Sequence, residues 1–171
     1  MTNIESSGFR IEALDLSHDR RTFSCGVESL DRYFRVQAGQ EARKNIAATF
    51  VLVGPNGQVA GYYTLSATSV ALAELPGDIA RRLPRYPSVP ATLLGRLAVE
   101  RRRRGKGLGR FMLADALWRA ARNEIASFAV VVDAKDEAAR NFYRREGFLP
   151  LPDRPLKLFL PMAAIARLFG D

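Results

Sequence analysis

The chain has little of what disulfide, thiol or metal chemistry requires. Its 171 residues include one cysteine, Cys25, and one histidine, His18. A lone cysteine cannot form an internal disulfide, which agrees with a reducing cytosol. Because His18 lies in a charged segment, a catalytic Cys25–His18 pair is the weaker hypothesis, and we expect Cys25 to be a small buried side chain. We expect no metal site.

Long apolar runs are missing as well. No stretch approaches the roughly 20 apolar residues that a membrane-spanning helix needs. The first residues include Glu5 and Arg10 and no apolar segment of the kind that a signal peptide has. We therefore expect a cytoplasmic protein without a membrane partner. Its length fits one domain over residues 1–171, enough to bury roughly two thirds of the unfolded chain's surface.

Positive charge is abundant. Lysine and arginine total 26 and aspartate and glutamate total 18, which gives a net charge of +8. This balance makes a nucleic acid or another polyanion a candidate partner. The alternative is that one basic run binds the phosphates of a small ligand while the others are solvated surface. The main runs are Arg20–Arg21, Arg81–Arg82, Arg101–Arg104 and Arg144–Arg145.

Hydrophobic periodicity predicts an α+β fold, or a mixed α/β sheet, behind an antiparallel meander. An Asn56-Gly57 hairpin turn indicates an antiparallel meander at the start. After it, Pro84, Pro87 and Pro90 force an extended crossing to a central strand. We expect strands at 9–14, 47–53, 58–64 with a possible extension at 70–72, 92–99, 128–132 and 156–160. We expect helices at 27–44, 75–83, from Gly109 onward, at 136–146 ending at a Gly147 cap, and at 161–169.

The central strand leads into a loop suited to an anion. The arginine run is followed by Gly105, Gly107 and Gly109 and then by a helical pattern. Glycine lets a ligand approach the backbone closely and allows positive φ where a turn needs it. The unpaired N–H groups and the dipole at the helix start favour a phosphate group.

Three further interpretations of this loop can be weighed from spacing. A nucleotide-binding P-loop needs a glycine five residues before Gly105 and a hydroxyl residue after Lys106, but Glu100 and Gly107 stand there. A dinucleotide fold needs Gly-x-Gly-x-x-Gly, which the spacing here does not match, although Asp133 imitates the acidic residue of that motif. The remaining interpretation is a solvated basic turn before an ordinary helix.

Two motifs resemble a known superfamily. Arg104-x-x-Gly107-x-Gly109 resembles the pyrophosphate loop of the GNAT acetyltransferases, and the segment Ala139–Phe148 is similar to their late helix motif, Ala-x-x-Phe-Tyr-x-x-x-Gly-Phe. The resemblance implies the GNAT fold, a central mixed, mostly antiparallel sheet flanked by helices. It also implies a splayed central strand and a glycine loop that leads into a helix.

A narrower resemblance covers about Phe9 to Pro161. The chain is similar to the toxin acetyltransferases of type II toxin–antitoxin modules. That family implies acetyl-CoA as donor, the α-amine of aminoacyl-tRNA as acceptor, and a block of translation. It also implies a ribbon-helix-helix antitoxin as partner, with a homodimer left open. The segments that carry the resemblance are Phe23–Gly26, Ser29–Tyr33, Gly61–Thr64, Leu83–Pro87 and Leu94–Val99.

The resemblance also implies the cofactor-binding residues. In those enzymes the splayed strand pairs with pantetheine, and the loop wraps the pyrophosphate with help from the helix start. The strand residues here are Leu97, Ala98 and Val99, and the loop and helix residues are Arg104, Gly105, Lys106, Gly107, Leu108, Gly109 and Arg110. Many GNAT enzymes have Asn where this chain has Asp136, so we expect no cofactor contact from that side chain.

Tyr143 matches the family's tyrosine beside the sulfur of acetyl-CoA. A phenol with a pKa of about 10 stays protonated at neutral pH and can donate to a thiolate whose parent thiol titrates near ~8.5. Without the motif, Tyr143 would be interpreted as a core aromatic. No general base stands out, which favours an α-amine of pKa ~7.7–8.0 over a lysine as acceptor. Glu100 could assist, but its arginine neighbours favour a salt bridge.

Arginines outside the loop are candidates for holding tRNA, against the alternative that they are ordinary surface charge. Two other functions stay open: an acetyltransferase for a small amine or a protein N-terminus, and a basic nucleic-acid-binding regulator without enzymatic activity. The candidate substrate-binding residues are Arg81, Arg82, Arg85 and Arg96.

Overall fold

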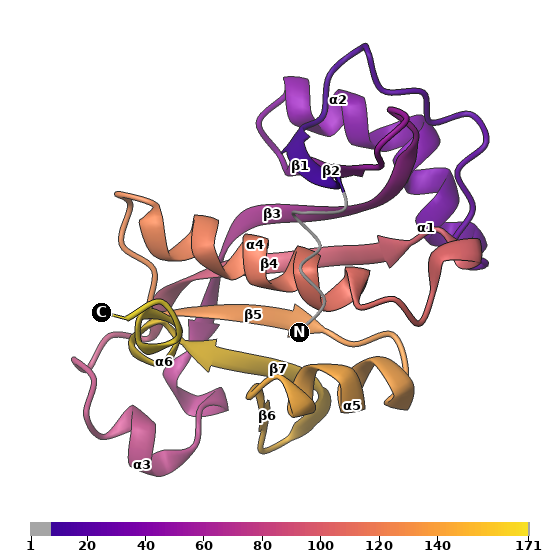
Figure 1. Ribbon diagram of the computed structural model, residues 1–171. Coiled ribbons are helices and arrows are strands. Elements are labelled where there is room, and N and C mark those ends of the chain that lie inside the picture. Colours follow the sequence, from indigo (N-terminus) through magenta and orange to yellow (C-terminus); the bar gives the residue numbers. More distant parts are fainter. Residues whose placement is uncertain (1–7, 171) are drawn as a thin grey trace. The chain divides into compact units, whose positions relative to one another are not determined.

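The computed structural model describes residues 8–170 (Figure 1). They form an α/β fold whose strands are hydrogen-bonded in the order β1-β2-β3-β4-β5-β7-β6. The strands are β1 (Arg10–Ala13), β2 (Ala48–Val53), β3 (Val59–Ala71), β4 (Ser88–Val99), β5 (Ala129–Asp133), β6 (Leu149–Leu151) and β7 (Arg154–Pro161). The helices are α1 (Glu28–Arg32), η2 (Tyr33–Gln37), α2 (Ala38–Arg43), η3 (Leu72–Glu74), α3 (Gly77–Ala80), η4 (Arg101–Arg103), α4 (Leu108–Arg122), α5 (Glu137–Arg145) and α6 (Met162–Leu168).

The chain divides into two compact units. The first unit runs to Ser66 and resumes over Gly95–Ala116, and the second comprises Ala67–Leu94 and the chain from Leu117 onward. Strands β3 and β4 and helix α4 therefore each contribute residues to both units. The pairing confirms the predicted mixed, mostly antiparallel sheet, since the β4–β5 pair is parallel whereas the β1–β2, β2–β3, β5–β7 and β6–β7 pairs are antiparallel.

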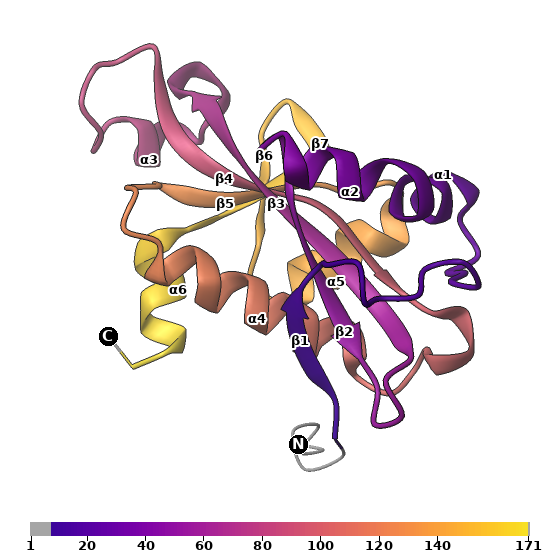
Figure 2. The ribbon, with the colours of Figure 1, turned by 90° about the horizontal axis from the view of Figure 1, so that it is seen from above.

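The first unit contains the predicted antiparallel meander. Strand β1 pairs with β2 from Arg10↔Val53 to Ala13↔Phe50, and β2 pairs with β3. The connecting turn closes by a 2.8 Å hydrogen bond from the Gly54 N–H to the Gln58 carbonyl. Gly57 has a φ of +82° there, which explains the glycine of the Asn-Gly signal. Figure 2 shows the helical segment of residues 28–43 running beside β2 and β3.

That helical segment was predicted as one helix and contains a wider turn. In η2 the Ala38 N–H bonds to the Tyr33 carbonyl, five residues back, which is the π-helical pattern. The Phe34 carbonyl accepts a 2.8 Å hydrogen bond from Arg20 Nη1. As a result Tyr33 and Phe34, although adjacent, are both buried in the core of the first unit. Periodicity did not predict this turn, because the arginine that supports it is distant in sequence.

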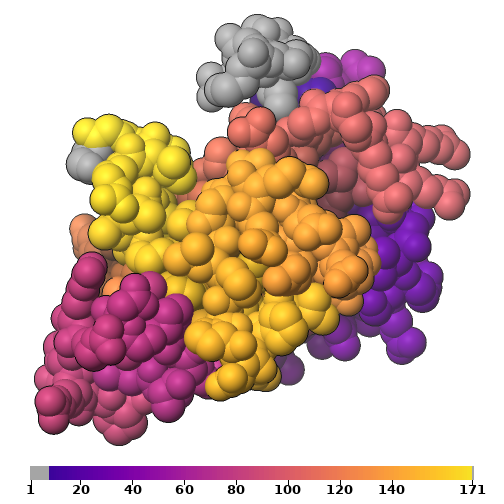
Figure 3. Space-filling model, turned by 90° about the horizontal axis from the view of Figure 1, so that it is seen from below, coloured from indigo at the N-terminus to yellow at the C-terminus, as the bar shows by residue number. Residues whose placement is uncertain are grey.

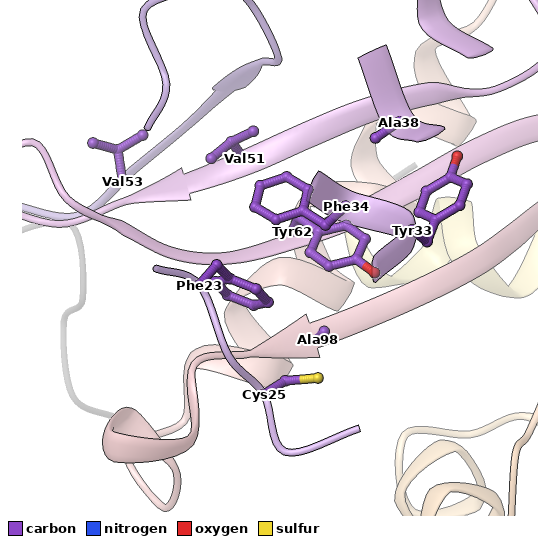
Figure 4. Close-up of a cluster of buried hydrophobic side chains, with 9 residues drawn as sticks. All are labelled: Phe23, Cys25, Tyr33, Phe34, Ala38, Val51, Val53, Tyr62 and Ala98. Atoms are coloured by element: carbon purple, nitrogen blue, oxygen red, sulfur yellow. The ribbon is translucent and has the colours of Figure 1, made fainter. Parts of the chain in front are cut away.

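Figure 4 shows that core, in which aromatic rings pack between the helices and the strands. The rings of Phe34 and Tyr62 are stacked at 4.3 Å, and Phe23 meets both rings edge to face. The Tyr62 hydroxyl donates a 2.6 Å hydrogen bond to the Leu30 carbonyl and so ties β3 to α1. The buried members are Phe23, Cys25, Tyr33, Phe34, Ala38, Val51, Val53, Tyr62 and Ala98.

The second unit is built on β5. This strand pairs in parallel with β4 over Ala91–Leu94 and in antiparallel with β7 over its whole length. Three consecutive valines, 130 to 132, are fully buried, as the continuous apolar run predicted. Helix α5 starts at the N-cap Asp136, whose carboxylate accepts a 2.8 Å bond from the Ala139 N–H, and Gly147 follows it with a φ of +99°.

Several elements differ in extent from the prediction, and one strand was not predicted. Strand β3 continues through Ala71, and β4 begins at Ser88 and includes the exposed Pro90. Helix α3 covers only Gly77–Ala80 of the predicted 75–83. The three-residue strand β6 was missed, because Pro150 and its short length conceal it from pattern analysis. Its pairing with β7 is a tertiary effect.

Buried phenols should make the fold sensitive to alkali. Burial raises the pKa of Tyr62, of Tyr143 and of Tyr33 above the ordinary value. At Tyr33 the positive charge of the nearby Arg96 opposes this rise. Above pH ~10 the unfolded chain releases phenolic protons that the native state retains, so the free energy of unfolding must fall as pH rises.

We expect a lower Tm at pH 10.5 than at pH 8, measured by circular dichroism, with a shallower dependence on pH for Tyr62→Phe. This variant also loses the bond to Leu30, at about 1 kcal/mol, at every pH. The slope between the two pH values is therefore the informative quantity. Parallel curves for wild type and variant would show that Tyr62 does not titrate with unfolding.

Candidate functional site

The segment Glu100–Arg103, called the arginine turn below, follows the end of β4 and is hydrogen-bonded to two other segments of the first unit. The Glu100 N–H donates to the Ala60 carbonyl at 2.8 Å, and the Arg101 N–H donates to the Ser24 carbonyl at 2.9 Å. One 3₁₀ turn, η4, then reverses the chain. These backbone bonds fix the direction in which the glycine loop leaves the strand.

The glycine loop has the backbone that its sequence predicted, with one difference. Gly105 and Gly107 have φ values of +77° and +79°, the left-handed region that disfavours other residues. A Cβ placed on Gly105 would meet no atom within 4 Å, so the space above the loop is open. Gly109 lies inside α4, which begins one residue earlier, at the buried Leu108. The first N–H groups of this 15-residue helix lack partners within the helix and adjoin the loop.

Arg104 does not extend its side chain freely from the loop. Its Nη2 donates a hydrogen bond to the carbonyl of Cys25. The Cys25 N–H in turn donates to the buried carboxylate of Asp31 at 2.8 Å. Gly26 has a φ of +89°, and a Cβ there would come within 3.3 Å of the Arg104 guanidinium. The Arg104 side chain thus anchors the loop to the Cys25–Gly26 segment.

Leu97, Ala98 and Val99 lie past the end of the parallel β4–β5 register, which covers Ala91–Leu94. A Cβ on Gly61 would lie 2.8 Å from the Ala98 carbonyl oxygen and 2.9 Å from the Met112 side chain of α4. The absence of a side chain at Gly61 therefore allows β3, β4 and α4 to approach closely under the loop. Gly61 belongs to one of the segments that carry the family resemblance, but the sequence pattern around it gives no signal for this packing role.

An open hollow of about 930 Å³ lies beside the arginine turn in the first unit. Its wall includes an ion pair of 3.7 Å between Glu100 and Arg103, which confirms the predicted salt bridge. Asp19, also in the wall, is held anionic, because hydrogen bonds from Arg21 lower its pKa to about 2. The cationic members of the wall outnumber these two carboxylates. They are Arg101, Arg102, Arg103 and Lys106.

Tyr143 lies in α5 of the second unit and is 8% exposed. Its ring meets Phe142 and Phe148 edge to face, at 5.1 Å and 5.4 Å between ring centroids. Burial raises the pKa of this phenol, so it stays protonated at any physiological pH. The contacts account for its packing, and the raised pKa makes it a hydrogen-bond donor that resists giving up its proton.

The predicted substrate-binding arginines fall into two groups. Arg81, Arg82 and Arg85 are exposed in the second unit, in the segment after α3 that belongs to the magenta surface of Figure 3. Arg96 belongs to the first unit, and its guanidinium carbon lies 3.4 Å from the centroid of the Tyr33 ring. Sequence spacing did not predict this stacking.

The Cys25–His18 hypothesis is wrong. His18 Nδ1 accepts a 3.0 Å hydrogen bond from the Asp15 N–H, and its Nε2 therefore carries the proton and donates to Glu12 at 2.7 Å. Both ring nitrogens are thus engaged away from the buried Cys25. Residues 8–170 contain no group of three His, Cys, Asp or Glu side chains placed to hold a metal. Within that range, no helix is long and apolar enough to cross a membrane.

Comparison with known proteins finds the same architecture in acetyltransferases. The Acetyltransferase (GNAT) family matches residues 13–148. A tRNA-acetylating toxin from Mycobacterium tuberculosis is 39% identical over 155 residues, covering 90% of this chain and 92% of the relative. AtaT complexed with acetyl-methionyl-tRNAfMet superposes with a TM-score of 0.87 at 32% identity, covering 95% of this chain and 99% of AtaT.

A further solved structure contains a tyrosine-to-phenylalanine variant of the AtaT toxin bound to the C-terminus of the antitoxin AtaR and to acetyl-CoA. It superposes with a TM-score of 0.81 at 28% identity, covering 96% of this chain and 99% of that one. The family match extends over most of the chain and includes the glycine loop, so the dinucleotide-fold interpretation is excluded. The chain belongs to the GNAT acetyltransferase family.

Proposed function

We propose that this chain is a toxin that transfers the acetyl group of acetyl-CoA to the α-amino group of aminoacyl-tRNA and thereby blocks translation. The similarity to a tRNA-acetylating toxin over nine tenths of the chain carries the proposal. The glycine loop and the excess of arginine agree with the two anionic ligands, acetyl-CoA and tRNA.

The cofactor site in this proposal is mainly a backbone site. The N–H groups of Gly105 to Gly109 and of the first turn of α4 would bind the pyrophosphate, with Lys106 and Arg110 adding positive charge. Residues 97–99 of β4 would pair with the pantetheine amides. Arg104 contributes indirectly, because its guanidinium holds the loop against the Cys25 carbonyl. This assignment gives each glycine with positive φ in the loop a function.

The reaction requires one proton to leave the amine and one to reach the sulfur. The neutral α-amine attacks the thioester carbonyl, the new C–N bond forms, the C–S bond breaks, and CoA departs as a thiolate. Tyr143 would donate a hydrogen bond to that thiolate. Because burial raises the pKa of Tyr143, full proton transfer to a sulfur of pKa ~8.5 is unfavourable, and solvent completes the protonation.

The acceptor amine does not need a strong base. At pH 7 about a tenth of an α-amine of pKa ~7.7–8.0 is neutral, whereas a lysine amine of pKa ~10.4 is under about 0.1% neutral. Glu100 forms an ion pair with Arg103. We therefore assign proton removal from the amine to water.

The same proposal extends to organisation and partners. We propose one catalytic domain over residues 1–171, because the family match runs through both units. We also propose a cytoplasmic enzyme, restrained by a ribbon-helix-helix antitoxin and able to form a homodimer. The antitoxin bound to the similar toxin AtaT supports a partner of that kind.

The cofactor site is tested by Gly107→Asp. The new carboxylate repels the pyrophosphate, and the left-handed φ of +79° is strained for a residue other than glycine. We therefore expect acetyl-CoA affinity, measured by calorimetry, to fall by about tenfold or more. Gly170→Asp is the control, since it adds the same charge at a φ of +85° with no atom within 4 Å of the Cβ, and it belongs to the second unit and not to the wall of the hollow. Equal affinity of wild type and Gly107→Asp would remove the loop from the site.

The role of Tyr143 is tested by Tyr143→Phe, which deletes only the hydroxyl. We expect unchanged acetyl-CoA affinity and a loss of roughly 10²-fold in single-turnover acetyl transfer, the usual cost of removing one hydrogen-bond donor to a developing negative charge. Tyr86→Phe, at a tyrosine 65% exposed in the same unit, should be neutral. A loss below about threefold for Tyr143→Phe, far less than the removal of such a donor costs, would leave Tyr143 a packing residue.

The acceptor is tested with labelled acetyl-CoA and aminoacyl-tRNA, deacylated tRNA or the free amino acid, each at two salt concentrations. We expect label only on the aminoacyl-tRNA, and less at high salt, with a slope of roughly 0.7–0.9 per phosphate contact. Alanine at Arg81, Arg82 and Arg85 together should reduce that slope, whereas alanine at the exposed Arg167 should not. Equal labelling of the free amino acid would favour a small-amine acetyltransferase.

A further inference from the structure

Arg96 and Tyr33 form a stacked pair at the edge of the first unit's core. The guanidinium carbon lies 3.4 Å from the centroid of the Tyr33 ring, which places the cation flat against the aromatic face. Tyr33 is 2% exposed, whereas Arg96 is half-buried. One face of the guanidinium is thus covered, and solvent reaches part of the side chain.

The Tyr33 ring is held rigidly. It is the first residue of the π-helical turn η2, and its neighbour Phe34 stacks on Tyr62 at 4.3 Å with an interplanar angle of 2°. Tyr33 itself stacks on Tyr62 at 6.4 Å and 22°. Figure 4 shows these rings packed together between the helical ribbon and β3. A side chain stacked on Tyr33 therefore rests on a fixed surface.

Arg96 stands beside the strand residues assigned to the cofactor. Side chains alternate along a strand, so Arg96 and Ala98 face the same side of β4, and Ala98 belongs to the core cluster that contains Tyr33. Leu97 lies between them. No carboxylate among residues 8–170 forms an ion pair with Arg96. The ring covers one face of the guanidinium, and the half-buried side chain leaves its remaining donors open to an anion.

We propose that Tyr33 is a positioning residue that holds Arg96 for the acceptor. Stacking covers one face of the guanidinium and fixes its plane, while the N–H donors at its edge stay free to bind a phosphate of the aminoacyl end of tRNA. The inference rests on the proposed function, and it adds the π-helical turn to the acceptor site. Such turns often occur at functional sites.

The competing interpretation is structural: Arg96 covers the open end of the aromatic core and binds nothing. Both interpretations predict some loss of stability when the pair is broken. They differ in the KM for aminoacyl-tRNA, which changes only if the orientation of Arg96 contributes to acceptor binding. They also differ for lysine at position 96, since lysine retains the charge and much of the cover but lacks the planar donors.

The test measures kcat and KM for aminoacyl-tRNA in wild type, Tyr33→Leu, Tyr33→Phe and Arg96→Lys, with acetyl-CoA affinity by calorimetry and Tm as controls. We expect Tyr33→Leu and Arg96→Lys to raise KM by roughly 2- to 30-fold, the range of a cation–π contact, with little change in kcat or cofactor affinity. Tyr33→Phe keeps the ring and should stay within about twofold of wild type, below the effect of losing the contact.

Three results separate the hypotheses. A lower Tm with an unchanged KM for both Tyr33→Leu and Arg96→Lys would overturn the proposal and favour the structural cover. If Tyr33→Leu does not fold, Arg96→Lys alone decides, because it leaves the core rings intact. If wild type does not acetylate aminoacyl-tRNA, the proposed function fails and this inference fails with it. If wild type is active but the KM of the variants is unchanged, only this inference fails.

Discussion

The contact on which the site depends most is the one between the glycine loop and the Cys25–Gly26 segment. A loop rich in glycine has high conformational entropy and does not hold one geometry by itself. Here the Arg104 guanidinium binds the Cys25 carbonyl, and the buried Asp31 carboxylate binds the N–H of the same residue. The ordered carbonyl therefore becomes a fixed point for a loop whose own residues have little preference for one conformation.

Two kinds of arginine can be distinguished by their partners. Arg20, Arg35 and Arg104 donate to backbone carbonyls and so hold segments of the first unit together. Other cations form part of the wall of the hollow or, like Arg96, rest on an aromatic ring. The net charge of +8 therefore overstates the number of arginines available to a polyanion. Composition alone does not separate these roles, because they depend on which carbonyls and rings lie nearby.

Much of the fold could be predicted from the sequence because its signals are local. The hairpin at Asn56-Gly57, the buried run of β5 and the Gly147 cap of α5 each depend on residues a few positions apart. The glycine loop was likewise found from spacing. The π-helical turn, strand β6 and the Arg104 anchor were not found, because each requires a partner distant in the chain. Tyr143 was assigned from a motif, and its environment accounts for its burial without establishing its chemistry.

The interleaving of the two units along the chain has a consequence for synthesis. The first unit needs Gly95–Ala116 to close its sheet and supply the loop, although its other segment ends at Ser66. A nascent chain must therefore hold residues 8–66 in an incomplete state until β4 and the start of α4 have left the ribosome. Until then strand β3 lacks β4, its neighbour in the sheet. The anion-binding loop is thus among the last parts of the first unit to be made, and neither unit can be isolated by a single cut in the gene.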